Sequence, residues 1–391
     1  MLPPEAVLAS EDSLRLNVLL TQAQAVRIDE RGPTVVGLAG SRELRVQLHP
    51  QGREDAYLLA VRRLLANLVI GHPGGFPVFI RRWLRGGQLE NLRTADLLKL
   101  GEPEAVLAAA AAPGIDDEVA RRAWWACPSA AVARALLGNP VLPRDGLKPE
   151  LAAWLAEHLP FEQDDEAIMQ TLRLVAAPGL LPPALRERLW RRGSELPAYR
   201  VGFLLAAPGD LPEQRPPRAG QEEAAALAEE AGSAPLAALL AHALDGPGQA
   251  FLAACDGVLG NPSDREIISP LLNLLGAYAA AAGFPGEPPD TVEQLAEGAD
   301  AALADAATDA AGVVARLPQL AAEVRALVLL AGANEALCYA VFARSTATGT
   351  LLRDKLATVL QPLRDAIAAL LGASAKPTLS RRQRQRLSRS G

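Results

Sequence analysis

The stretch QAVRIDERGPTVVGLAGSRELRVQL, residues 24–48, decides the fold of the N-terminal part of this 391-residue chain. Its short β-type runs are separated by Gly32-Pro33 and Gly40-Ser41, which are residue pairs that favour turns. Three such runs in succession predict a small antiparallel meander.

Past Glu54 the apolar residues take up the spacing of a helix. The residues that make this pattern are Tyr57, Leu58, Val61, Leu64, Leu65 and Leu68. We expect this helix to cover one face of the meander, because its polar residues then point to solvent. The result is a small α+β domain over residues 1–88.

Beyond residue 93 the apolar residues keep a helical period. The phrase Ala-Ala-Pro-Gly occurs three times, at 111–114, 176–179 and 206–209. Proline removes a backbone donor and glycine tolerates positive φ, so each copy is expected to end a helix. The sequence therefore predicts a mainly α protein, an irregular HEAT-like helical array preceded by a small α+β N-terminal domain.

The first two copies of the phrase precede helices of one pattern, in which an apolar residue is followed four positions later by a second and five positions later by tryptophan. The two sets are Val119, Ala123, Trp124 and Leu185, Leu189, Trp190. This similarity indicates a degenerate helical repeat over residues 93–214.

The second half of the chain begins after a proline-rich stretch at 215–220, which predicts a domain boundary. Residues 221–373 predict a second all-helical unit, in which Ser263 and Glu266 have the spacing of a capping box. Residues 374–391 are small, polar and basic, and we expect a disordered tail there.

The net charge of −6 conceals an asymmetry, because the last sixteen residues hold six positive side chains and residues 1–375 carry −12. Because residues 1–375 are acidic, the sequence excludes the class of proteins that coat nucleic acid with their whole surface. The tail could bind RNA or another polyanion by charge, with Arg381, Arg382, Arg384 and Arg386 as candidate contacts. A tail that serves only solubility is the alternative, and it is favoured. No aromatic residue accompanies the arginines, so stacking on bases is not implied.

Three cysteines, at 127, 255 and 338, are odd in number and far apart, which indicates a reducing compartment. The first residues lack the basic region and apolar run of a secretory signal. The most apolar stretch, 326–343, is interrupted by Asn334-Glu335, and a carboxylate at that depth of a bilayer is costly. We therefore expect a cytoplasmic protein without a membrane partner.

The common catalytic signatures are missing from the sequence. No lysine follows a glycine as in a phosphate-binding loop, and G-x-G-x-x-G, C-x-x-C and H-E-x-x-H do not occur. The serines at 41, 194 and 345 lack the glycines of a nucleophile elbow. On this basis no catalytic, cofactor-binding or metal-binding residue is predicted, and the chain is expected not to be an enzyme.

Three further features have a functional and a structural interpretation. The loop at 72–77 could approach a ligand closely, but a tight connection is favoured. The acidic run 162–166 could attract a cation or a basic partner, although acids at the start of a helix already favour its dipole. Trp124 and Trp125 point about 100° apart on one helix. Either that helix is buried on several sides, which is favoured, or at least one tryptophan is an exposed partner contact.

Several stretches of the N-terminal half, in their order along the chain, resemble the DsrS family. The stretches are 13–20, 25–30, 71–77 with 81–83, 97–137, 159–162 and 199–204. Members of this family are accessory proteins encoded beside the reverse-acting dissimilatory sulfite reductase of sulfur-oxidising bacteria. The resemblance implies a cytoplasmic protein that supports sulfur oxidation by influencing production or assembly of the oxidising enzymes. It implies no known active site and no cofactor.

Two functions from different classes follow. The first is a non-enzymatic accessory or regulatory protein whose helical surfaces contact a protein partner, with RNA as a further partner of the tail. The second is a thiol-dependent enzyme or carrier acting on sulfur species, with Cys127 or Cys338 as the thiol. Both cysteines look buried and inert in sequence, because a reactive thiolate needs a positive and accessible setting.

Overall fold

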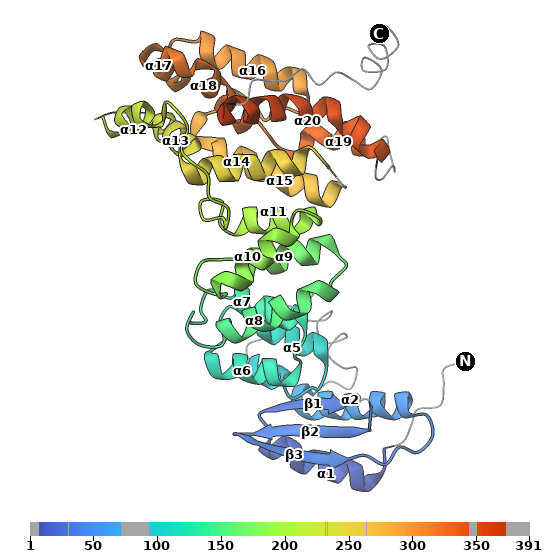
Figure 1. The fold of residues 1–391 in the computed structure, drawn as a ribbon. Coiled ribbons are helices and arrows are strands. Elements are labelled where there is room, and N and C mark those ends of the chain that lie inside the picture. Colours follow the sequence, from blue (N-terminus) through green and yellow to red (C-terminus); the bar gives the residue numbers. More distant parts are fainter. Residues whose placement is uncertain are drawn as a thin grey trace. The chain divides into compact units, whose positions relative to one another are not determined.

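A computed structural model describes residues 8–29, 31–71, 94–230, 232, 234–262, 264–343 and 350–372, except the side chains of 350–354 and 358. The loop predicted at 72–77 and the tail from 374, with its four candidate arginines, lie outside these residues. The chain divides into two compact units, Met1–Pro160 and Phe161–Gly391, called here the N-terminal and the C-terminal unit. Both are drawn in Figure 1.

The N-terminal unit contains the predicted meander, with strands β1 (Ala25–Asp29), β2 (Thr34–Ala39) and β3 (Arg42–Gln47) in the order β1-β2-β3. Its register pairs Val26 with Gly37 and Val35 with Val46. Because side chains alternate along a strand, Val26, Val35 and Val46 share one face of the sheet. The opposite face carries charged side chains.

Helices α1 (Ser10–Gln22) and α2 (Glu54–Ile70) cover the apolar face, as expected from the pattern after Glu54. Leu19 of α1 and Leu65 of α2 belong to the same buried cluster as the three valines of the sheet. Gly37 permits the close approach of α1, because a Cβ there would lie 2.8 Å from Leu19 Cδ1. The fold class is as predicted at this end of the chain, a small α+β assembly.

A buried carboxylate connects these helices. Asp12 of α1 has no exposed surface, and it accepts hydrogen bonds from the Tyr57 hydroxyl (2.6 Å) and the His49 backbone N–H (2.8 Å). The His49 ring Nδ1 lies 3.1 Å from the same carboxylate. Burial alone would raise the pKa of Asp12, but the hydrogen bonds from Tyr57 and His49 together hold it below its usual value.

The remaining described residues of the N-terminal unit form helices and their connections. Its elements are α4 (Thr94–Leu97), α5 (Pro103–Ala110), α6 (Asp117–Ala126), α7 (Ala130–Gly138) and α8 (Lys148–His158). The backbone N–H of Val26 donates to the Leu98 carbonyl at 2.8 Å, which ties the edge of β1 to the segment after α4. Helix α5 packs against α6 and α7, and α7 packs against α8. This packing places the end of α6 beside β1.

Over its described residues, the C-terminal unit consists of helices joined by loops. The longer ones are α9 (Asp165–Val175), α10 (Pro183–Arg192), α11 (Pro197–Ala206), α12 (Gln221–Glu229), α13 (Pro235–Leu244), α14 (Gly246–Leu259), α15 (Arg265–Ala279), α16 (Val292–Ala304), α17 (Asp309–Arg316), α18 (Ala321–Ala331) and α20 (Thr350–Leu371). Helices α9 and α11 pack closely, and a Cβ on Gly202 would lie 2.6 Å from Leu172 Cβ. Helix α18 contacts α15, α16 and α20.

Each Ala-Ala-Pro-Gly phrase lies at the end of a helix. Two copies directly follow α5 and α9, which end at Ala110 and Val175, and the third begins at the last residue of α11, Ala206. The glycine has positive φ only in the second copy, at Gly179 (φ 84), so proline is the common cause of the breaks. The two sequence sets that predicted equivalent helices begin at the same position in each helix. Val119 is the third residue of α6, and Leu185 is the third residue of α10.

Two details concern the predicted second helical unit. The stretch 215–220 has no helix, and its Arg218 guanidinium donates to the Ala369 carbonyl (2.6 Å) at the end of α20 and pairs with buried Glu323 (2.6 Å). The predicted capping box is wrong by one residue: the N-cap of α15 is Asp264, whose carboxylate accepts from the Ile267 N–H at 3.1 Å. The charged cap is favoured at the positive end of the helix.

Within the described residues, no single helix is long and apolar enough to cross a membrane. One pair, Pro318–Ala331 with Glu335–Ala343, reaches that length and composition together but is bent by 79°. The bend falls at the Asn334-Glu335 interruption noted in the sequence.

Replacing Asp12 by Asn tests the buried carboxylate. Asn keeps the shape but turns an amide toward hydrogen-bond donors, so urea unfolding at pH 7 is expected to show a loss of about 1–3 kcal/mol. Because the pKa of Asp12 is lowered in the folded state, its contribution is complete above the unfolded value of about 3.9 and is lost as the pH falls below it. The difference between wild type and D12N should therefore shrink as the pH falls from about 4 toward about 2.

The exposed Asp55, whose side chain is 87% accessible, provides the matched control, and D55N should leave the unfolding free energy almost unchanged. A difference between wild type and D12N that does not change with pH would contradict the assignment.

Candidate functional site

The charged face of the sheet is organised around Glu43 of β3. Its carboxylate accepts hydrogen bonds from Arg27 Nη2 and Arg45 Nη2, both at 2.9 Å, and from the indole Nε1 of Trp125 at 3.0 Å. The register places Arg27, Val36 and Arg45 in one row across the three strands. The bonds from Arg45 and Trp125 hold the pKa of Glu43 below its ordinary value, so the carboxylate is charged at neutral pH.

Trp125 is the link between the sheet and α6. The guanidinium carbon of Arg27 lies 4.6 Å from the centroid of its ring, which is the geometry of a cation–π contact. The indole thus touches the sheet with its face and with its N–H. The residue as a whole is partly buried.

Trp124 lies on the other flank of α6 and contacts α8. Its Nε1 donates to Glu150 at 3.1 Å, and its ring meets Trp154 edge to face with centroids 5.1 Å apart. Trp154 in turn stacks on His158 at 3.8 Å. Both tryptophans of α6 are half-buried, and each is held by a carboxylate on a different element.

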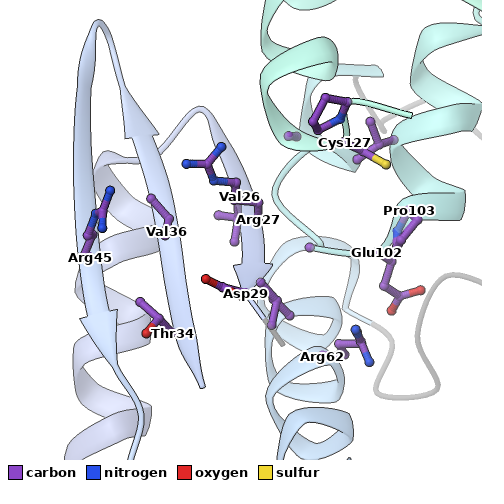
Figure 2. A pocket seen from close by; sticks show the side chains of 15 residues that line it. Val26, Arg27, Asp29, Thr34, Val36, Arg45, Arg62, Glu102, Pro103 and Cys127 are labelled. Carbon is purple, nitrogen blue, oxygen red and sulfur yellow. The ribbon is translucent and has the colours of Figure 1, made fainter. Parts of the chain in front are cut away.

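A pocket of about 580 Å³ opens beside this network, within the N-terminal unit. One wall is the charged face of the sheet, with Arg27, Asp29, Thr34 and Arg45; the other is built by the start of α5 and the turn after α6. Figure 2 shows Arg45 and Arg27 on the strands, and Cys127 across the pocket from them. Arg62 of α2 and Glu102, the N-cap of α5, lie together at one end.

The three cysteines differ in their surroundings. Cys127 follows α6, is half-buried and lines the pocket, with its Sγ 3.6 Å from the Ser129 hydroxyl. Cys255 and Cys338 are fully buried. Burial raises the pKa of the Cys338 thiol to about 12 and raises that of Cys255 as well. Among the thiols, Cys127 is therefore the accessible one.

The acidic run has a structural role at the start of α9. Asp164 is the N-cap, and its carboxylate accepts from the Glu166 N–H at 3.1 Å. Burial, together with the charges of Asp264 and Asp164, raises the pKa of Asp165. Within the residues that the structure describes, no group of three or more histidine, cysteine or acidic side chains could hold a metal ion.

Sequence reasoning singled out the two tryptophans but missed Arg27, Glu43 and Arg45. A signal for these three was present, because charged residues occupy the alternate positions of the strands that do not face the core. Their contact with Trp125 joins residues 82 positions apart, and no spacing rule reports such a pair.

Comparison with known proteins gives no relative: no family model, no curated protein and no solved structure matches this chain.

The thiols give a direct test of the pocket wall. In the native protein at pH 7, N-ethylmaleimide is expected to label Cys127 and to leave Cys255 and Cys338 unmodified, because buried thiols with raised pKa form little thiolate. All three should react after unfolding in guanidinium, as read by mass spectrometry. Rapid native labelling of Cys255 or Cys338 would contradict the burial, and C127S should abolish native labelling.

Proposed function

We propose that this chain is a non-enzymatic accessory or regulatory protein that works through contacts with a protein partner. The observation that carries the proposal is the pair of tryptophans on α6, each partly buried and each held by a hydrogen bond to a carboxylate, Trp124 to Glu150 and Trp125 to Glu43.

Such side chains suit recognition for a physical reason. Tryptophan is enriched among the residues that contribute most to protein interfaces. Binding normally costs the entropy of ordering side chains at the interface. Here the indole N–H groups are already bonded and the rings already packed, so less ordering is required when a partner covers them.

The biological setting is part of the same proposal: the protein supports bacterial sulfur oxidation in the cytoplasm as a DsrS-like protein. What supports it is the order of the resembling stretches along the N-terminal half. Residues 13–20 fall on α1, 25–29 on β1 and 120–125 on α6, so these stretches include parts of the core and of the tryptophan helix. The arginine tail is proposed as a second contact, for RNA or another polyanion.

A thiol-dependent enzyme or carrier acting on sulfur species is the second candidate. The observation that favours it is the position of Cys127 in the wall of the pocket, with arginine side chains on the facing sheet.

Capture of partners from cells oxidising sulfur tests the first proposal. The tagged full chain is expected to retain sulfur-oxidation proteins after nuclease treatment, and W124A or W125A should reduce their recovery at least tenfold. Y339A provides the matched control, because Tyr339 is a half-exposed aromatic residue of the C-terminal unit. Circular dichroism of each variant verifies the fold.

Three outcomes would contradict the proposal or redirect it. Equal recovery by wild type, W124A and W125A would remove the tryptophans as the contact. Recovery of RNA that disappears on deletion of residues 376–391 would make the tail the functional element. Recovery of partners that is lost in C127S, and that is also lost when the thiol is blocked by a modifying reagent, would favour the second candidate.

A further inference from the structure

We infer that the pocket between the charged face of the sheet and the start of α5 is a binding site for a small organic anion. Its anionic group would lie against the guanidinium groups of Arg27 and Arg45, and its short apolar body against the opposite wall. This inference goes beyond the proposed partner contact, because it concerns the pocket beside Trp125 and not the tryptophans themselves.

At the sheet wall the anionic group of the ligand would lie beside two guanidinium groups, while the Asp29 carboxylate lines the same wall. Arg27 and Arg45 share the single carboxylate of Glu43, whose Oε1 accepts from Arg27 and Trp125 and whose Oε2 accepts from Arg45. Each guanidinium has five N–H donors, and the bonds to Glu43 use one from each. The remaining donors match the geometry of a carboxylate, sulfonate or phosphate group.

The other wall is apolar. Pro103 and Val106 of α5 and Pro128 after α6 line it, and Val36 of β2 adds an apolar side chain to the sheet wall between Arg27 and Arg45. A volume of about 580 Å³ lies within the range of about 300–1,000 Å³ in which ligand pockets fall. A lining with both charged and apolar parts fits a ligand that has an anionic group and a hydrocarbon body.

Two carboxylates restrict the ligand to low charge. Asp29 lines the pocket from the end of β1, and its Oδ1 accepts from the Arg31 N–H at 3.0 Å. Glu102 is buried at the end that it shares with Arg62. Their negative charge opposes a polyanion, so the site selects a monoanion over a polyphosphate or RNA.

The rate at which the Cys127 thiol is alkylated reports whether the pocket is occupied. Its thiol lines the wall, whereas the other two cysteines are fully buried. A ligand in the pocket should therefore slow the alkylation of this one thiol.

The test uses 8-anilinonaphthalene-1-sulfonate, an organic monoanion with an aromatic body, on the full chain. Fluorescence titration is expected to show saturable binding of one probe per chain, with energy transfer from tryptophan that decreases in W125F. Saturating probe should slow N-ethylmaleimide labelling of Cys127 at least fivefold. R45A should weaken probe binding at least tenfold.

Arg45 and its control are both well exposed, so neither replacement should disturb folding. The side chain of Arg45 is 68% accessible and that of Arg53, which lies away from the pocket lining, is 79% accessible. R53A should bind the probe as wild type does. Equal probe affinity in R45A and wild type, or Cys127 labelling that the probe does not slow, would overturn the site.

Competition with the probe tests whether the ligand needs an apolar body as well as an anionic group. Hexanoate should displace the probe at concentrations where inorganic phosphate does not, because only hexanoate can occupy the apolar wall. Displacement by phosphate at equal or lower concentration would overturn the organic class of the ligand.

Discussion

The carboxylate of Glu43 is the interaction on which the candidate site depends. Three donors from β1, β3 and α6 converge on its two oxygens: Arg27, Arg45 and Trp125. This one side chain orders the pocket wall and fixes a tryptophan of the proposed partner surface. It is about one-third exposed, so its bonds contribute more to geometry than to the free energy of folding.

The position of Glu43 follows from the alternation of the strands. Val26, Val35 and Val46 face α1 and α2, and a shift of one residue would bury the charged set instead. The apolar face therefore fixes the register, and the register brings Arg27, Val36 and Arg45 into one row. The buried carboxylate of Asp12 stabilises the opposite face of the sheet, because it accepts hydrogen bonds from the Tyr57 hydroxyl in the core and from the His49 backbone N–H.

Much of the fold could be predicted from local sequence, and little of the site could be. The strands, the helix after Glu54 and the breaks before Pro113 and Pro178 depend on spacing and on backbone chemistry within a few residues. The bonds from Trp124 to Glu150 and from Trp125 to Glu43 depend on how helices pack, over separations of 26 and 82 residues. The N-cap of α15 is Asp264, one residue after the predicted Ser263, which lies outside the described residues.

The indole N–H signal of Trp125 gives the most direct test of the role of Glu43. In a ¹H–¹⁵N NMR spectrum of the full chain, W125F identifies this signal and W124F identifies that of its neighbour. In Glu43→Ala we predict that the Trp125 signal shifts and its N–H exchanges faster with solvent, while the Trp124 signal, bonded to Glu150, stays in place. A Trp125 signal with unchanged position and exchange rate in that variant would contradict the account.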